Sequence, residues 1–290
     1  MTSRVRHAIL QFQPLKGRRA ANLKQFAGQL KELQDAGVQA DVIVLPEAAF
    51  TGYFLQGGVR ELAVTAEEFA SELTAACAAY PKPVDVIAGF YERRGREYFN
   101  SALYLEVTET GSRVRHVHRK VFLPTYGVFD EDRFLTRGNR FEAFDTRFGR
   151  AALLVCEDAW HSISGTICAL SGADVMYILN ASPARGLEGT EPGNATYWRN
   201  VVRGLAGEHG TYVILSSLVG FEGGKGFTGT SLVAHPDGHV LAEAPSLEPA
   251  ALIAEVNLDA IQAARYDNPL LADLRNTLPS VLPALTEALR

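Results

Sequence analysis

Cys156 ends an apolar run and is followed at once by two acids. Residues 150–155 read RAALLV, and Glu157 and Asp158 come directly after the cysteine. A thiol within an apolar run is commonly an inert core residue, whereas strand ends in open α/β sheets often carry functional side chains. A helix predicted near 162–171 would place the thiol on a tight bend between strand and helix. Locally, Cys156 is either a packed core thiol or a nucleophile.

Two charged residues are the next candidates for chemistry. Glu47 follows the apolar segment VIVLP, and it is either an exposed acid at a strand end or a general base. Lys120 lies in the segment RHVHRKVFLP, where nothing local distinguishes it from Arg115 and Arg119. His161 is close to Cys156 in sequence and could form a Cys–His pair. Each signal is weak by itself.

The remaining motifs argue against metal and nucleotide chemistry. Cys77 is predicted to lie in the middle of a helix and Cys168 in a small-residue helix, both as core residues. No histidine stands at metal-ligand spacing from a cysteine, so we expect no metal in the site. The segment GKGFTG (224–229) fits a dinucleotide-binding pattern only formally, because a strand and not a helix follows it. We therefore expect no cofactor.

Composition narrows the class of protein. The 290 residues are 47% hydrophobic and 21% charged, which is typical of a globular chain with a sizeable core. The net charge of −5, with scattered Lys and Arg, argues against nucleic-acid binding. No signal peptide or membrane-spanning run is recognisable, and three cysteines form no disulfide framework. We expect a cytoplasmic protein that binds no membrane.

Strands and helices alternate along the chain. Amphipathic spacing predicts helices over 20–36 and 196–208, and continuous apolar runs predict buried strands. The segments ADVIVLPEA (40–48) and ADVMYILNASP (173–183) echo each other, which indicates two similar halves that bring Glu47 and Asn180 to a shared crevice. We expect one domain over 1–290, with 269–290 as a C-terminal extension that packs on the outside or on a partner subunit.

Three stretches together resemble the nitrilase superfamily of carbon–nitrogen hydrolases. They are LPEAAFTGY (45–53), HRKVFLPTYGVFDEDRF (118–134) and LLVCEDAW (153–160). NSALYLE (100–106) and NASPA (180–184) are also similar to the family. The resemblance implies an α/β fold, a four-layer α-β-β-α sandwich, which commonly forms a homodimer or higher homo-oligomer through its outer helices.

The resemblance also implies roles for the candidates. Cys156 would attack the substrate carbon and form a thioester, with Glu47 as general base and acid. Lys120 would stabilise the oxyanion together with a backbone N–H after the cysteine, and its positive field would favour the thiolate. By position in TYGVFDE, Glu131 would be a second glutamate that orients Lys120 or holds the substrate nitrogen. We expect Glu157 and Asp158 to anchor the bend and not to act as the catalytic acid.

The segment LPTYGVFDE is closest to the glutaminase domain of glutamine-dependent NAD synthetases, although no ATP-binding domain follows it here and Thr125 stands where asparagine is more usual. Similar aromatic residues line the glutamine pocket of that domain. We expect these residues to bind substrate: Tyr53, Tyr126, Phe129, Glu157, Asn180 and Ser182.

The sequence therefore predicts thiol-dependent hydrolysis of a small linear amide to an acid and ammonia. The alternatives are a nitrilase, an N-carbamoyl amidohydrolase whose Arg185 or Arg199 would clamp a substrate carboxylate, and a glutaminase subunit that delivers ammonia to a separate synthetase. Acyl transfer to an amine is also open, since it shares the thioester. A binding protein on the same fold is the non-enzymatic alternative.

Overall fold

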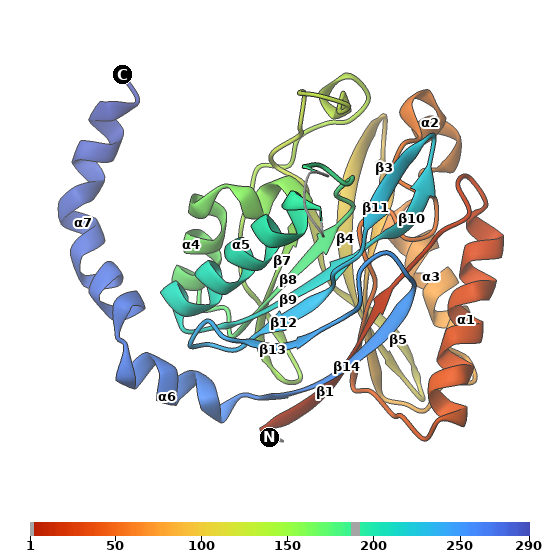
Figure 1. Ribbon diagram of the computed structural model, residues 1–290, viewed down its shortest axis with the longest axis horizontal. Coiled ribbons are helices and arrows are strands. Elements are labelled where there is room, and N and C mark those ends of the chain that lie inside the picture. The colour runs from red at the N-terminus through yellow and green to blue at the C-terminus, as the bar shows by residue number, and fades with distance from the viewer. Residues whose placement is uncertain (1–2, 187–191) are drawn as a thin grey trace.

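Two six-stranded sheets pack face to face and carry helices on their outer faces, as the computed structural model shows (Figure 1). The structure describes residues 3–186 and 192–290. Helices α1 and α3 cover one sheet, and helices α4 and α5 cover the other (Figure 1). The four layers are therefore helix, sheet, sheet and helix, as the sequence predicted.

The elements have the following bounds. The strands are β1 (Arg4–Gln11), β2 (Val42–Val44), β3 (Val84–Arg94), β4 (Glu97–Thr108), β5 (Gly111–Arg119), β6 (Phe144–Thr146), β7 (Gly149–Val155), β8 (Val175–Asn180), β9 (Tyr212–Ser217), β10 (Val219–Glu222), β11 (Lys225–Thr228), β12 (Leu232–Ala234), β13 (Val240–Glu243) and β14 (Ala250–Asn257). The helices are α1 (Arg19–Asp35), α2 (Val59–Leu62), α3 (Ala66–Ala76), α4 (Ser162–Leu170), α5 (Gly193–His209), α6 (Asp259–Asp267) and α7 (Leu270–Ala288). Short 3₁₀ turns span Gln56–Gly58, Glu131–Arg133 and Cys156–Trp160.

The two sheets have the same internal arrangement. The first has the order β14-β1-β2-β3-β4-β5, and the second has the order β13-β12-β9-β8-β7-β6. In each sheet three parallel strands form the centre, namely β1, β2 and β3 in the first and β9, β8 and β7 in the second. The strands beyond them are antiparallel. This repetition is the pseudo-symmetry that the echoing segments predicted.

The parallel strands are apolar because both of their faces are covered. One core lies between the sheets, where Val44 and Tyr104 of the first sheet belong to the same cluster as Leu153 and Tyr177 of the second. A second core lies under α1 and α3 and is rich in phenylalanine, including Phe26, Phe50, Phe69 and Phe90. Burial of these faces on both sides holds the strand ends, and so the site, in fixed positions.

Several boundaries differ from the sequence predictions. The apolar segment over 40–48 predicts a longer strand than the structure has, because β2 ends at Val44 before Pro46, which lacks a backbone N–H for the ladder. Strand β5 ends at Arg119, one residue before Lys120. Cys77 is buried as predicted, but it directly follows α3 and does not lie in mid-helix. Short strands such as β6 and β13 were not anticipated.

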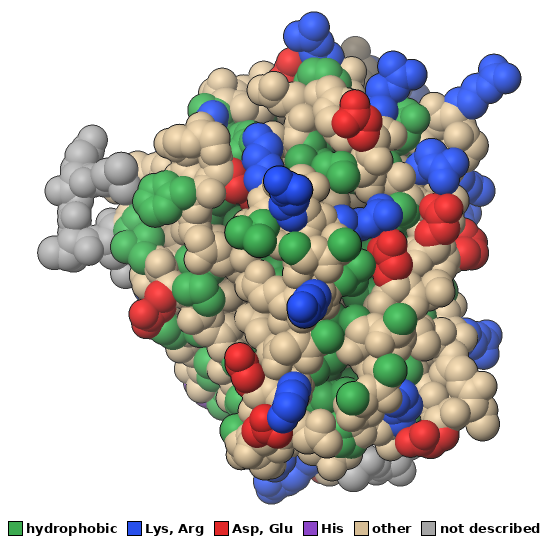
Figure 2. Space-filling view, turned by 90° about the vertical axis from the view of Figure 1, so that its right-hand side faces the viewer, with side chains coloured by type: hydrophobic (Ala, Val, Ile, Leu, Met, Phe, Trp, Pro, Cys, Tyr) green, Lys and Arg blue, Asp and Glu red, His purple; other side chains and the backbone are tan. Residues whose placement is uncertain are grey.

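The outer face that includes α1 carries charges of both signs. Figure 2 shows Lys and Arg interspersed with Asp and Glu on the side that lies to the right in Figure 1. One exposed pair on α1 joins Lys31 Nζ to Asp35 Oδ2 at 2.5 Å. The apolar face of the same helix, with Phe26, Leu30 and Leu33, points into the core.

The C-terminal segment forms helix α7, which lies outside α4 (Figure 1). Most of its side chains are exposed, and Val281, Leu282 and Leu285 each expose about half of their surface, at 48%, 49% and 49%. Among the described residues, no helix combines the length and the apolar character needed to cross a bilayer.

Candidate active site

Lys120 is a fully buried ammonium held between two carboxylates. Its Nζ lies 2.9 Å from Glu47 Oε1 and 2.9 Å from Glu131 Oε1, and its exposed fraction is 0%. Asn100 Nδ2 donates to the same Glu47 oxygen at 2.7 Å, and the Tyr53 hydroxyl donates to Glu131 Oε1 at 2.5 Å. Burying one cation requires such partners. Glu47, which is 73 residues from Lys120 in the sequence, therefore joins Lys120 and Glu131 in one ion-pair network.

The end of strand β2 positions Glu47 through an unusually close packing of backbones. Leu45 N–H donates to Ile87 O of β3 at 2.8 Å, which carries the chain one residue past the strand. A Cβ on Gly89 would lie 2.6 Å from Glu47 Cα, so only glycine fits there. Ala48, the next residue, has φ of 51°, a strained conformation for a residue with a Cβ. Such local strain is typical of functional positions.

Cys156 also lies at a strained turn, directly after β7. Its φ is 46°, in the left-handed region, where the chain leaves the strand and enters the 3₁₀ turn. Cys156 is 6% exposed, and the backbone of Ala181, just past the end of β8, acts to lower the pKa of its thiol. The predicted bend between strand and helix is therefore present, with the thiol held at its apex.

Asp158 fixes this bend to the segment that carries Lys120. Its Oδ1 accepts the backbone N–H groups of Val121 and Phe122, both at 3.0 Å. Its Oδ2 accepts Val155 N–H at 3.1 Å and lies 2.8 Å from His118 Nε2. All of these contacts are structural, and they join the two sheets across the site. The expectation that Asp158 acts as an anchor agrees with this geometry.

Burial determines the resting state of the thiol. It raises the pKa of Cys156 well above its ordinary value, and the nearby Glu47 raises it further, while Lys120 lowers it. The predicted effect of Lys120 therefore has the right sign but does not prevail. The resting group is a neutral thiol at pH 7, so attack requires a base that removes its proton.

Burial acts in opposite directions on the pKa values of Lys120 and Glu131, although both pKa values are raised in the end. Burial alone would lower the pKa of Lys120, but the neighbouring Glu131 and Glu47 raise it well above its ordinary value. Burial raises the pKa of Glu131, which Lys120 partly offsets. The ammonium is therefore permanent at neutral pH. Its positive charge is available wherever negative charge develops next to Cys156.

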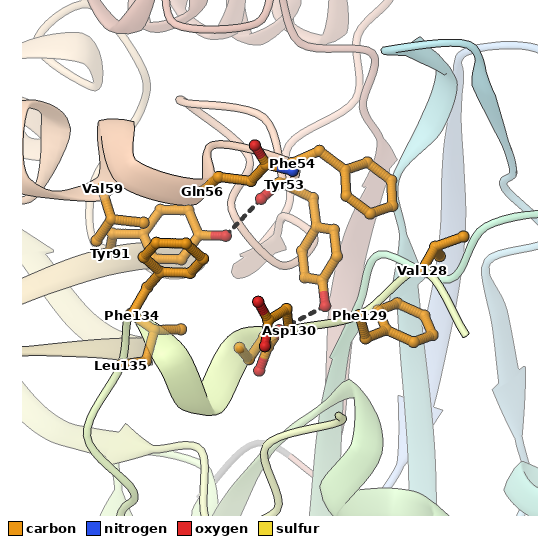
Figure 3. Close-up of a pocket in the computed structure, with 11 residues that line it drawn as sticks. Tyr53, Phe54, Gln56, Val59, Tyr91, Val128, Phe129, Asp130, Phe134 and Leu135 are labelled. Carbon is orange, nitrogen blue, oxygen red and sulfur yellow. Dashed lines mark hydrogen bonds between the residues drawn. The ribbon is translucent and has the colours of Figure 1, made fainter. Parts of the chain in front are cut away.

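A small aromatic pocket of about 50 Å³ adjoins this network. The rings of Tyr53, Phe129 and Phe134 line it, and the Tyr91 hydroxyl donates to Tyr53 O at 2.6 Å (Figure 3). Tyr53 and Glu131 line the pocket and also belong to the ion-pair network. They form the wall between the pocket and Lys120.

The other predicted binding residues lie in two groups. In the first group, Phe129 lines the aromatic pocket and packs edge-on against Tyr126. The Tyr126 hydroxyl donates to Glu157 Oε2 at 2.8 Å. At the end of β8, Asn180 Nδ2 donates to Ser217 Oγ at 3.1 Å, and Ser182 Oγ accepts from Asn194. Whether these groups contact a substrate stays a prediction.

Other candidates turn out to lie elsewhere. His161 stacks on Phe122 at 3.8 Å between ring centres and has Nε2 3.8 Å from Glu157, so its described contacts do not form the proposed Cys–His pair. Arg119 is bound to Glu92 at 2.6 Å, which distinguishes it from Lys120.

The sequence analysis did not single out Asn100, whose side chain donates to Glu47. The available signal was a polar residue at the start of the otherwise apolar segment NSALYLE.

Comparison with known proteins gives the family. Residues 6–266 match the family model described as carbon-nitrogen hydrolase. The chain is 31% identical to a glutamine-dependent NAD(+) synthetase of Rhodobacter capsulatus over 86% of its own length, but spans 43% of that protein. It is 26% identical to an N-carbamoylputrescine amidase of Arabidopsis thaliana, covering 86% of this chain and 87% of that one.

A solved structure extends the match to three dimensions. A carbon-nitrogen hydrolase from Helicobacter pylori G27 superposes with a TM-score of 0.84 at 27% identity, covering 96% of this chain and 98% of that chain. The chain belongs to the carbon–nitrogen hydrolase family, and its fold is that of the nitrilase superfamily. It is a hydrolase that acts on carbon–nitrogen bonds other than peptide bonds.

Proposed function

We propose that this enzyme hydrolyses a small linear amide through a thioester on Cys156. The observation that carries the proposal is the buried ion-pair network, in which Lys120 is 2.9 Å from both Glu47 and Glu131 and acts electrostatically on the thiol. A core cysteine has no need of three buried charges. An enzyme that develops an oxyanion and moves one proton has a use for each of them.

The first half of the reaction makes the thioester. Glu47 removes the proton from Cys156 as Sγ attacks the carbonyl carbon, and Lys120 with the backbone N–H of Glu157 stabilises the oxyanion. When the tetrahedral intermediate collapses, the C–N bond breaks. The protonated Glu47 returns its proton to the nitrogen, which leaves as ammonia.

Water completes the cycle. Glu47 removes a proton from water, which attacks the thioester carbon. The C–S bond then breaks to release the acid, and the protonated Glu47 returns its proton to Sγ, which restores the thiol. In this scheme Glu131 positions Lys120, since Lys120 Nζ and the Tyr53 hydroxyl both donate to one of its oxygens. The reaction uses no metal and no cofactor.

The decisive experiment is mass spectrometry of the acylated enzyme with a panel of small amides. We expect an adduct on the peptide containing Cys156 whose mass identifies the acyl group. Cys77 and Cys168 are buried thiols with pKa values raised by burial to about 12, and they serve as internal controls. Ammonia release without any adduct on Cys156, under conditions that trap intermediates, would overturn the proposal.

Product assays separate the neighbouring reactions. A nitrilase would release ammonia from nitriles but not from the matched amides. A carbamoyl amidohydrolase would release CO₂ together with ammonia. A glutaminase subunit would hydrolyse glutamine, and coupling to a separate synthetase would raise its rate. A rate that increases with an added amine would indicate acyl transfer instead of hydrolysis.

Arg185 is the better of the two candidates for binding a substrate carboxylate. Its guanidinium carbon lies 5.9, 5.7 and 5.6 Å from the ring centres of Tyr126, Phe129 and Trp160. Arg199 is instead bound to Glu243 at 2.7 Å. If the substrate is an N-carbamoyl amino acid, Arg185→Gln should raise its KM while leaving an uncharged amide unaffected. Equal effects on both substrates would remove Arg185 from recognition.

We also propose that the chain forms a homodimer or higher homo-oligomer through its outer helices. The exposed leucines and valine of α7 support this, because isolated apolar stripes of this kind commonly meet a partner. Light scattering of the wild type and of a Leu282→Glu, Leu285→Glu double variant tests it. The proposed compartment is the cytoplasm, because the chemistry needs a reduced Cys156 and all three cysteines are unpaired. Cell fractionation tests the location.

A further inference from the structure

The turn between β12 and β13 has the sequence HPDGH and lies far from the catalytic network. Strand β12 runs antiparallel to β9, and Ala234 at its end pairs with Val213 near the start of β9. Strands β7, β8 and β9 are parallel, and Cys156 follows the end of β7. The turn over 235–239 therefore lies near the start of the parallel strands of the second sheet, whereas the thiol lies at their carboxyl ends.

Three metal-binding side chains converge at this turn. His235, Asp237 and His239 each offer a ligand atom, and the three atoms lie within 4.8 Å of one another. The Nδ1 atoms of the two histidines are 3.1 and 2.6 Å from the same oxygen of Asp237. Ligands around a tetrahedral zinc ion are about 3.3 Å apart, as follows from metal–ligand distances of ~2.0 Å. Small movements would thus admit an ion.

The turn is held rigidly against helix α5. Gly238 N–H donates to His235 O at 2.8 Å, and His235 N–H donates to His239 O at 2.9 Å. Arg203 Nε donates to Gly238 O at 3.0 Å, and a Cβ on Gly238 would lie 3.5 Å from Gly207 Cα of α5. A preformed set of ligands loses little conformational entropy when an ion binds.

Charged side chains of α5 line the groove next to this turn. Glu208 of α5 lines the same open groove as Asp237 and His239. Its side chain is half exposed, at 54%, so it can move. Arg203, which also lines the groove, has its Nε bound to Gly238 O. Water can complete the coordination.

We propose that His235, Asp237 and His239 bind one divalent transition-metal ion, with Glu208 as an additional ligand or a charge at its edge. Two imidazoles favour zinc, nickel, cobalt or copper, whereas Mg²⁺ and Ca²⁺ prefer oxygen ligands alone. Binding would link β12, β13 and, through Glu208, α5. This inference does not depend on the proposed amide hydrolysis, since the turn is remote from Cys156.

The test is isothermal titration of the tag-free protein with Zn²⁺ and Co²⁺, with Mg²⁺ as a control ion. We expect one Zn²⁺ per chain and a thermal midpoint raised by a few degrees. His235→Ala and His239→Ala should each weaken binding by about tenfold or more, since even partners outside the coordination shell can have that effect. Glu208→Gln should have a smaller effect. Co²⁺ should give visible absorption bands that the histidine variants lose.

Two control variants test whether the metal ion binds elsewhere on the protein. Cys156→Ser should keep the stoichiometry of the wild type, which separates this site from metal capture by the catalytic thiol. His161→Ala, an exposed histidine elsewhere, should also bind normally. If the double variant His235→Ala, His239→Ala binds Zn²⁺ as the wild type does, or if the wild type binds none, the metal site is refuted. Asp237 then serves only as a hydrogen-bond acceptor for the turn.

Discussion

The two sheets of this enzyme have the same strand arrangement but contribute different chemistry. The first sheet supplies Glu47 after β2, Asn100 in β4 and Lys120 after β5, all charged or hydrogen-bonding groups. The second supplies Cys156 after β7 and, past the end of β8, the Ala181 backbone that contacts it. The proposed active site therefore lies where the two halves face each other.

The comparison also shows how the halves are joined. Polar links cross from one half of the molecule to the other at several points, and two of them start from the buried side chains of His7 and Asp158. His7 Nε2 of β1 lies 2.9 Å from the Tyr177 hydroxyl of β8, and Asp158 accepts the backbone N–H groups of Val121 and Phe122. A repeated fold therefore needs specific polar contacts to fix the relative position of its halves. The proposed catalytic groups of one half, the thiol of the other and these links can each be perturbed separately.

Removing the Cys156 thiol, which the second half contributes, should lower the rate of hydrolysis more than any other change. We expect Cys156→Ser to lower kcat about 10⁴-fold or more, because the nucleophile is lost from a group of residues that act together. Ammonia release from the best amide measures it. Cys168→Ser is the matched control, since Cys168 is also a buried thiol of this half with its pKa raised to about 12. Comparable losses in both variants would contradict the assignment.

Removing Glu47, the proposed base that the first half contributes, should have the second largest effect on the rate. We expect Glu47→Gln to lower kcat/KM roughly 10²- to 10⁴-fold, because the neutral thiol then lacks a proton acceptor. Steady-state rates with the same amide measure it, and circular dichroism checks folding.

Glu92→Gln provides the control for this half. Glu92 is also a buried acid bound to a cation, with Arg119 at 2.6 Å, but it lies outside the network around Lys120. The change should lower stability without a comparable loss of rate. A similar fall in kcat/KM in the two variants would mean that general loss of structure explains the result at Glu47.

The link through His7 should make stability depend on pH. Burial lowers the pKa of His7 from 6.5 to about 4, so between these values the unfolded chain binds more protons than the folded one. Stability should therefore be fully present above pH 6.5 and fall by up to roughly 3 kcal/mol as pH drops to 4.

Urea unfolding over this pH range measures the dependence. His7→Gln keeps a polar group but cannot be protonated, so its slope with pH should be smaller than that of the wild type. Equal slopes in the wild type and His7→Gln would show that other groups, such as the half-buried His116 and the buried His209, account for the acid sensitivity.

Weakening the hydrogen bonds of Asp158 should have the smallest effect on stability and on kcat. Asp158→Asn should lower stability by about 1–3 kcal/mol, because buried N–H groups lose part of their acceptor. It should also lower kcat modestly by shifting the segment that carries Lys120, with little change in KM. Thermal unfolding and steady-state kinetics measure both. Asp132→Asn, an exposed acid on the neighbouring loop, should change neither. A normal kcat in the destabilised Asp158 variant would show that the link serves stability alone.

The sequence predicted the elements well where periodicity was strong. The spacing of Phe26, Leu30 and Leu33 gave α1, and continuous apolar runs gave the central parallel strands. It failed at short elements, because a strand of three residues such as β6 carries too little pattern to recognise. The end of β2 was also misplaced, since Pro46 acts through one missing hydrogen bond that an apolar run conceals.

By itself the sequence determined which residue types are present and in what order. Cys156, Glu47 and Lys120 could be named because their combined motifs are specific, although each alone was ambiguous. Tertiary structure decided that Lys120 and not Arg119 is the buried cation, that Asn100 joins the network, and that the thiol rests protonated. The physical reason is that burial and charge interactions depend on distances across two sheets. Those distances exist only after the halves have packed together.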